Sequence, residues 1–344
     1  MGCCVTTKAN IPQKSNMESP NTHSSAEYSY IKNYSYITVH NNQLFVAEAS
    51  QGSKLMAINE DIQLPENFAI TMLSSKKLLI AGGKVASRLS KRTYEIDIRT
   101  KTAIEKSRLP ERCKGGQLHL VGEKVYLVGT CNKHEEPLPI MVLEQETWGL
   151  LDLEGPLLKM PGSFLKDHSI YLLGGLIEDS PNFSIFCFDT YEGSFKECNT
   201  KLTTSLLNAN CIHLGGNQAL IAGGTNVQTM HPSQQAFIYQ IDSSIKQILS
   251  APNVLSACPL QLFDTIAVTL SYPNLLIFDL KDTTWTVKSV TDKTKLVTIE
   301  RHEAIMGEEE ESDIDYSSKL DACEDVQENV LEDINPDHIK IITN

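Results

Sequence analysis

A short phrase returns six times along this chain, and it limits the possible folds more than any other feature. Each copy is an apolar run that ends in small or polar residues: LFVAEA (44–49), LLIAGG (78–83), VYLVGT (125–130), IYLLGG (170–175), ALIAGG (219–224) and IAVTLS (266–271). Aligned on the position of the two glycines, successive copies are 35, 47, 45, 49 and 46 residues apart. A strand-like repeat with a period near ~50 residues indicates small β units rather than a helical solenoid.

The segments around each copy repeat as well. A half-alternating strand such as QLHLVGEK precedes the phrase, and after a variable loop comes a third strand such as IFCFDT. A fourth strand begins near an aromatic residue: Phe195 and Trp285 each lie six residues after an acidic residue, Asp189 and Asp279. Four short strands separated by turns predict a four-stranded antiparallel meander in each unit.

The recurring residues have specific expected roles. Glycine accepts φ > 0 and lets backbones approach closely, so the glycines should lie where the second strand turns beside a neighbouring unit. They are Gly82, Gly83, Gly129, Gly174, Gly175, Gly223 and Gly224. The trailing aromatic should fill the wedge between adjacent units, and two units have a tryptophan, Trp148 and Trp285.

This pattern resembles the kelch-repeat family of β-propellers over roughly residues 28–290. The resemblance implies an all-β fold, a six-bladed kelch-type propeller whose four-stranded blades close radially and hide most sheet edges. Five or seven blades, or a β-sandwich with accidental spacing, are the alternatives. Three units depart from the diglycine, with Ala47-Glu48, Gly129-Thr130 and Thr269-Leu270 in its place.

Charge divides the chain of 344 residues unevenly. Its net charge is −13, and the residues from 301 onward carry 14 acidic and 3 basic side chains. We therefore expect three parts: a flexible leader (1–27), the propeller (28–290) and an acidic, largely disordered tail (291–344). The near-neutral body has no basic surface of the kind that binds nucleic acid.

Catalytic motifs are missing from the sequence. It has no G-x-S-x-G elbow, P-loop, G-x-G-x-x-G or H-E-x-x-H. His119 and His213 fall in equivalent first strands, and we interpret them as structural. The nine cysteines are scattered without a C-x-x-C pair, which indicates a reducing compartment and no zinc site. We expect a protein that is not an enzyme and holds no cofactor or metal.

By the same resemblance, partners dock where the loops after second strands and the connections between blades gather on one face. The loop 84–92 and the connection 108–114 concentrate seven cations there: Lys84, Arg88, Lys91, Arg92, Arg108, Arg112 and Lys114. We predict that these residues bind a protein partner with an acidic surface. A solvated charged face without a ligand is the alternative.

The N-terminus MGCCVTTK fits the N-myristoylation pattern M-G-x-x-x-[ST], with Gly2 as the acceptor and Thr6 completing it. One myristoyl chain holds a protein at a membrane only marginally, so a second signal is needed. Few cations lie nearby, and the adjacent Cys3 and Cys4 are therefore predicted palmitoylation sites. The alternative is that Cys3 and Cys4 are unmodified residues of the leader.

Together these expectations describe a lipid-anchored interaction scaffold on the cytoplasmic face of a membrane, of undetermined oligomeric state. Two other classes remain open. One is a propeller enzyme with a metal-dependent, oxidase-like site, and the other is a cytoskeleton-associated structural propeller.

Overall fold

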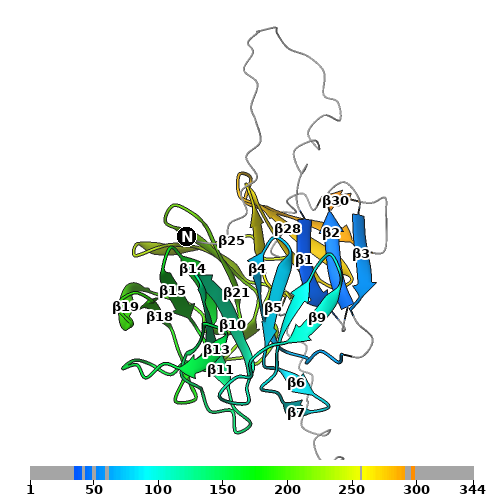
Figure 1. The fold of residues 1–344 in the computed structure, drawn as a ribbon. Coiled ribbons are helices and arrows are strands. Elements are labelled where there is room, and N and C mark those ends of the chain that lie inside the picture. Colours follow the sequence, from blue (N-terminus) through cyan, green and yellow to red (C-terminus); the bar gives the residue numbers. More distant parts are fainter. Residues whose placement is uncertain are drawn as a thin grey trace, which may run out of the picture. The chain divides into compact units, whose positions relative to one another are not determined.

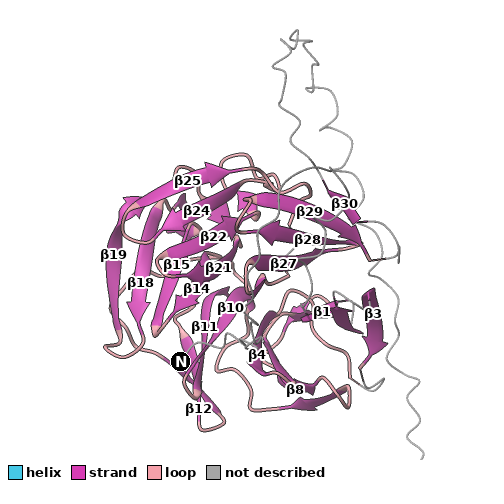
Figure 2. Ribbon diagram, turned by 90° about the horizontal axis from the view of Figure 1, so that it is seen from above, coloured by secondary structure: helices cyan, strands magenta, loops and turns pink. Residues whose placement is uncertain are grey.

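Six larger antiparallel sheets and three two-stranded ribbons make up the fold in the computed structural model, which describes residues 35–40, 43–48, 52–58, 62–255, 258–290 and 296–298. Figures 1 and 2 show the sheets arranged around a common centre. Every regular element in the described ranges is a strand. The described fold is thus an all-β propeller of six blades, as predicted, and it is compatible with the kelch type.

The blades follow one another along the chain. Blade 1 contains β1 (Ser35–His40), β2 (Gln43–Glu48) and β3 (Gly52–Ala57). Blade 2 contains β4 (Ala69–Ser74), β5 (Lys77–Ala81), β8 (Thr93–Asp97) and β9 (Thr102–Glu105). Blade 3 contains β10 (Lys114–Val121), β11 (Lys124–Cys131), β12 (Met141–Glu144) and β13 (Thr147–Leu150).

The second half of the ring repeats this plan. Blade 4 contains β14 (Gly162–Lys166), β15 (Ser169–Leu173), β18 (Ser184–Asp189) and β19 (Ser194–Lys201). Blade 5 contains β21 (Asn210–Gly215), β22 (Gln218–Ala222), β24 (Ala236–Gln240) and β25 (Ser244–Ile248). Blade 6 contains β26 (Gln261–Phe263), β27 (Ile266–Ser271), β28 (Asn274–Asp279), β29 (Thr284–Ser289) and β30 (Leu296–Thr298).

The number of strands differs between the first blade and the last. The first blade has three strands in the described ranges, and the last has five because β30 pairs with β29. The strand β30 lies beyond residue 290, where the sequence suggests the propeller ends. The chain divides into two units, 1–299 and 300–344, and the second lies outside the described residues, as does the leader 1–27.

The hydrophobic core is divided into six clusters, one at each junction between neighbouring blades. For example, Leu44 of blade 1 packs with Leu78 and Ile96 of blade 2. The other clusters join blades 2 and 3, 3 and 4, 4 and 5, and 5 and 6. The sixth contains Tyr36 of blade 1 and Val268 of blade 6, so the ring is closed.

Among the residues that the structure describes, side chains join the last blade to the first. The Tyr36 hydroxyl donates to the Pro259 carbonyl at 3.1 Å and accepts from the Leu270 amide at 3.3 Å. The Gln261 carboxamide accepts from the Ile37 amide at 3.2 Å and donates to the Ile37 carbonyl at 2.5 Å. In the described residues, no strand of blade 1 enters the sheet of blade 6.

The glycine pairs decide where second strands end. The strands β5, β15 and β22 stop immediately before Gly82, Gly174 and Gly223. In blades 1, 3 and 6, which lack the pair, the second strand runs through the equivalent positions. Both glycines of each pair have positive φ, from 66° to 87°, a conformation that interrupts ladder pairing.

Beside the three blades with glycine pairs lie small two-stranded ribbons, each with one strand that begins directly after a pair. They are β6 (Lys84–Val85) with β7 (Arg88–Leu89), β16 (Leu176–Ile177) with β17 (Ser180–Pro181), and β20 (Leu206–Leu207) with β23 (Thr225–Asn226). The diglycine therefore ends one strand and starts an additional layer of structure beyond the blade.

Candidate functional site: the loop face

Two kinds of loop gather at one edge of the propeller. In an antiparallel meander the second and fourth strands end at the same side, so loops after second strands lie beside the connections between blades. Backbone hydrogen bonds join them: Gly83 donates to Cys113 at 2.9 Å, and Gly175 donates to Leu206 at 2.9 Å. We call this edge the loop face; it comprises residues 82–92, 106–113, 132–140, 151–161, 174–183, 202–209 and 223–235.

Gly83 and Gly175 show why the loop face needs glycine. A Cβ atom on Gly83 would lie 2.4 Å from the Glu66 carbonyl oxygen, and one on Gly175 would lie 2.6 Å from the Lys159 carbonyl oxygen. Backbone atoms of another segment occupy that space, so only glycine permits the approach. Gly82, Gly129, Gly174, Gly223 and Gly224 are similarly enclosed, with every hypothetical Cβ under 3.0 Å from a neighbouring atom.

The other repeated residues have structural contacts. The Asp189 carboxylate accepts from the amides of Tyr191 at 2.8 Å and Glu192 at 3.1 Å, and thereby closes the β18–β19 turn. Asp279 does the same in blade 6. The side chains of Trp148 and Trp285 are 6% and 1% exposed and belong to the clusters between blades 2 and 3 and blades 5 and 6.

The two cationic segments lie together, but most of their charges contact the protein itself. Lys91 donates to the Pro110 carbonyl, and Arg112 donates to the Leu89 carbonyl at 2.9 Å. These bonds join the loop 84–92 to the connection 108–114. Glu105 pairs with Arg108 at 3.0 Å and with Arg92 at 3.9 Å.

Lys84 and Arg88 differ from the other five cations. Neither side chain has a hydrogen bond or ion pair with the described residues. Arg88 is exposed at the tip of the β6–β7 ribbon, and Lys84 is half-buried at its base. Of the seven cations, they are the two that are available to an external anion.

Acidic groups dominate the adjoining part of the loop face. Glu135 pairs with Lys114 and lies 3.8 Å from the Lys159 ammonium, which also contacts Asp179 at 3.3 Å. The Lys114 hydrogen bond lowers the pKa of Glu135. Glu136 and Glu178 are also present in these loops. The loop face is thus cationic at the β6–β7 ribbon and acidic in the loops of blades 3 and 4.

A partly buried polar network joins the inner strands of blades 3, 4 and 5. Ser163 donates its hydroxyl to the Gln117 side-chain oxygen at 2.7 Å, and His119 Nε2 lies 2.7 Å from the same hydroxyl. The Gln117 amide donates to the Ala209 carbonyl at 3.1 Å. Because the hydroxyl proton goes to Gln117, His119 Nε2 must donate. His119 therefore does not act as a base toward Ser163 here, and the network is structural.

Three of the described thiols are not activated as nucleophiles. Burial raises the pKa of Cys113 to about 12 and the pKa values of Cys131 and Cys198 to about 11. A thiolate is the reactive form, so these side chains are inert at neutral pH.

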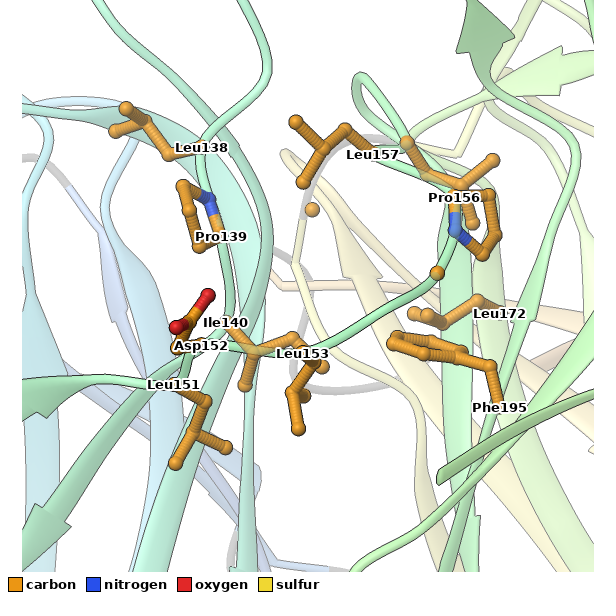
Figure 3. A pocket seen from close by; sticks show the side chains of 13 residues that line it. Leu138, Pro139, Ile140, Leu151, Asp152, Leu153, Pro156, Leu157, Leu172 and Phe195 are labelled. Carbon is orange, nitrogen blue, oxygen red and sulfur yellow. The ribbon is translucent and has the colours of Figure 1, made fainter. Parts of the chain in front are cut away.

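A pocket of about 290 Å³ lies in the wedge between blades 3 and 4 (Figure 3). Leu138 and Pro139 lie on one side of it, and Pro156 and Leu157 lie on the other. The connection between the blades enters this wedge at Gly155, where a Cβ would lie 2.2 Å from the Phe195 ring. Phe195 thus fills part of the wedge, as predicted for the trailing aromatic.

Sequence reasoning missed Lys159, Gly155 and the pocket. Lys159 is an isolated cation in the sequence, and only the fold places it between Glu135 and Asp179. Gly155 belongs to no diglycine. The one available signal was the apolar segment around it, LLDLEGPLL (150–158), which is too rich in leucine for an ordinary exposed connection.

Gly2, Cys3 and Cys4 lie outside the described residues. Within the described ranges, no helix is long and apolar enough to cross a membrane. Nor do three or more His, Cys, Asp or Glu side chains gather there in a metal-binding arrangement. No known family model matches the chain, and no curated protein matches it in sequence.

Proposed function

We propose that the protein is a membrane-tethered, kelch-type interaction scaffold that binds an acidic segment of a protein partner through its loop face. Propellers generally serve as rigid scaffolds for protein interaction, and variable loops on such a scaffold carry specificity. The resemblance to kelch repeats supports the same surface. The observation that carries the proposal is the β6–β7 ribbon, which presents Lys84 and Arg88 without partners in the described part of the chain.

Charge on the rest of the loop face limits the partner's orientation. An acidic segment is attracted to Lys84 and Arg88 and repelled by the neighbouring loops with Glu136 and Glu178. Complementary charge of this kind chiefly sets register and association rate, whereas apolar contacts supply most affinity. The partner is therefore expected to be bipolar, with acidic groups over blade 2 and basic groups over blades 3 and 4.

The tether rests on the N-terminal sequence. After removal of Met1, the Gly2 amine would attack the thioester of a myristoyl-coenzyme A, forming an amide and releasing the coenzyme thiol. Cys3 and Cys4 would accept further acyl chains as thioesters. Two acyl signals give stable membrane residence where one does not.

Charge reversal tests the partner surface. A fluorescent peptide of alternating Glu and Asp should bind the full-length chain at low salt, and Lys84→Glu with Arg88→Glu should weaken it at least fivefold. The matched control reverses Lys196 and Lys246, which are exposed on the outer strands β19 and β25. Equal affinities for the two double variants would remove the β6–β7 ribbon from the proposal.

Fractionation of cells tests the tether separately. Gly2→Ala should move the protein from the membrane to the soluble fraction, and Cys3→Ser with Cys4→Ser should weaken its retention. Membrane residence that persists in Gly2→Ala would contradict the acylation proposal and leave the partner surface unaffected.

A further inference from the structure

The pocket between blades 3 and 4 is lined mostly by apolar side chains. Thirteen residues line it, and Asp152 is the only one whose side chain carries a charge. Six of the thirteen are leucines: Leu138, Leu151, Leu153, Leu157, Leu158 and Leu172. Polar atoms, the Asp152 carboxylate among them, share the lining with these side chains, so the pocket offers apolar walls together with hydrogen-bonding groups.

The size of the pocket matches most of one acyl chain. A water molecule takes up about 30 Å³ of liquid, and a methylene group is of similar size, so about 290 Å³ holds roughly ten methylene groups. A myristoyl group is slightly longer than this. Its remaining carbons would lie at the rim beside Leu157, which is 49% exposed. The amide that joins an acyl chain to glycine would meet polar atoms of the lining.

The N-terminus is long enough to deliver such a group. The first described residue is Ser35, which lies 33 positions after Gly2. Fully extended, this stretch spans at most about 110 Å. A compact domain of about 260 residues has a radius of gyration of about 18 Å, so a group on Gly2 can reach any point of the propeller. Attachment in the same chain also makes insertion intramolecular, which favours it over capture of free ligands.

We propose that this pocket receives the acyl chain carried by Gly2, so that the protein alternates between a membrane-inserted and a self-bound acyl group. The inference rests on the proposed acylation. The inference also explains why acyl chains on Cys3 and Cys4 would be needed. While the acyl chain on Gly2 lies in the pocket, only the chains on the two cysteines would hold the protein at the membrane. Residues 138–140, which line the pocket, belong to the loop face, so a partner bound there would affect the exchange.

Binding of a free acyl probe tests the pocket without requiring acylation. Unacylated full-length protein is titrated with fluorescent N-myristoylglycine amide. We expect one site per chain, and Leu157→Asp should weaken binding at least tenfold. The matched control is Leu150→Asp, since Leu150 is 46% exposed at the end of β13 but does not line the pocket. That control should stay within twofold of the unmodified protein, and circular dichroism should show that both variants fold.

Vesicle partition tests the exchange in the acylated protein. The chain is co-expressed with an N-myristoyltransferase, its mass is measured, and it is sedimented with phosphatidylcholine vesicles. Leu157→Asp should raise the bound fraction severalfold over both the unmodified protein and Leu150→Asp, because the acyl group can no longer be withdrawn.

The outcomes separate the inference from the proposed tether. A mass without the acyl group would remove the tether and, with it, the acyl group on Gly2 as the occupant. If the acylated chain binds vesicles equally in the unmodified, Leu157→Asp and Leu150→Asp forms, the inference is overturned and the proposed tether is unaffected. Failure of the probe to bind would overturn the inference as well. A dimer that Leu157→Asp dissociates would also overturn it, because a second copy of the chain would then cover the pocket.

Discussion

The two tryptophans differ at the level of single atoms. Trp285 Nε1 donates to the Leu249 carbonyl at 3.0 Å. Trp148 Nε1 is buried without a hydrogen-bond partner in the described part of the chain. Both rings fill wedges between blades, so Trp→Phe removes similar packing at the two sites but a hydrogen bond at only one. We expect Trp285→Phe to destabilise the protein by about 1 kcal/mol more than Trp148→Phe, measured by urea unfolding. Equal losses would show that the bond contributes nothing.

His119 should make the fold sensitive to mild acid. Burial lowers its pKa to about 4, whereas a histidine in the unfolded chain titrates near ~6.5. Above that value both states are neutral, and as the pH falls toward 4 the unfolded state binds the extra proton and gains stability. The loss by pH 4 is at most about 3 kcal/mol.

His119→Gln removes this titration. The stability of the variant, measured by urea unfolding at each pH, should change less than that of the unmodified protein between pH 6.5 and 4. If the stability of the two proteins changes equally with pH, the assignment to His119 is contradicted, because the acid sensitivity then comes from other groups. The carboxylates Asp97, Asp189 and Glu135 have lowered pKa values, so they also lose stabilisation as the pH falls, but this loss is common to both proteins and cancels in the comparison.

At the scale of elements, the two central residues of the β6–β7 turn are poorly suited to its backbone conformation. Ala86 and Ser87 have φ of 47° and 64°, the left-handed pair of a type I′ turn, which strongly favours Asn-Gly. Left-handed backbone costs an ordinary residue about 1–2 kcal/mol. Replacing Ala86-Ser87 with Asn-Gly should therefore stabilise the ribbon by about 1–2 kcal/mol and raise the melting temperature measured by calorimetry.

The turn at Gln145–Glu146, with φ of 47° and 63°, is a matched site for the same replacement. A gain at 145–146 and none at 86–87 would mean that the β6–β7 ribbon opens independently of the blade. In that case the surface around Lys84 and Arg88 would be less rigid than the structure indicates.

The elements also show how far sequence reasoning reaches. Strand order, the glycine positions and the wedge-filling aromatics follow from local patterns that repeat, so they were predictable. The partners of the cations were not, because Arg112 bonds a carbonyl 23 residues away and Lys114 pairs with Glu135 through the packing of two segments. The pocket depends on how Phe195 and Gly155 meet, which no local pattern encodes.

At the scale of the whole molecule, stability depends on how the ring closes. Gln261 satisfies both backbone groups of Ile37 and links the first blade to the last. Gln261→Leu keeps similar bulk and leaves these groups unpaired, so we expect a loss of about 2–3 kcal/mol in urea unfolding. The control Gln247→Leu, at an exposed position of β25, should change stability by less than about 0.5 kcal/mol. A loss at position 261 no larger than the control would show that the apolar cluster alone closes the ring.

The closure through side chains has a consequence for how this architecture can change over generations. Every described blade is one uninterrupted stretch of chain, and none borrows a strand from the opposite end. The boundaries of blades in space therefore coincide with boundaries in the sequence. Joining the ends and opening the chain between two other blades should preserve every sheet. Duplication of one stretch would likewise add a complete blade, so such a gene can be reordered or lengthened in whole units.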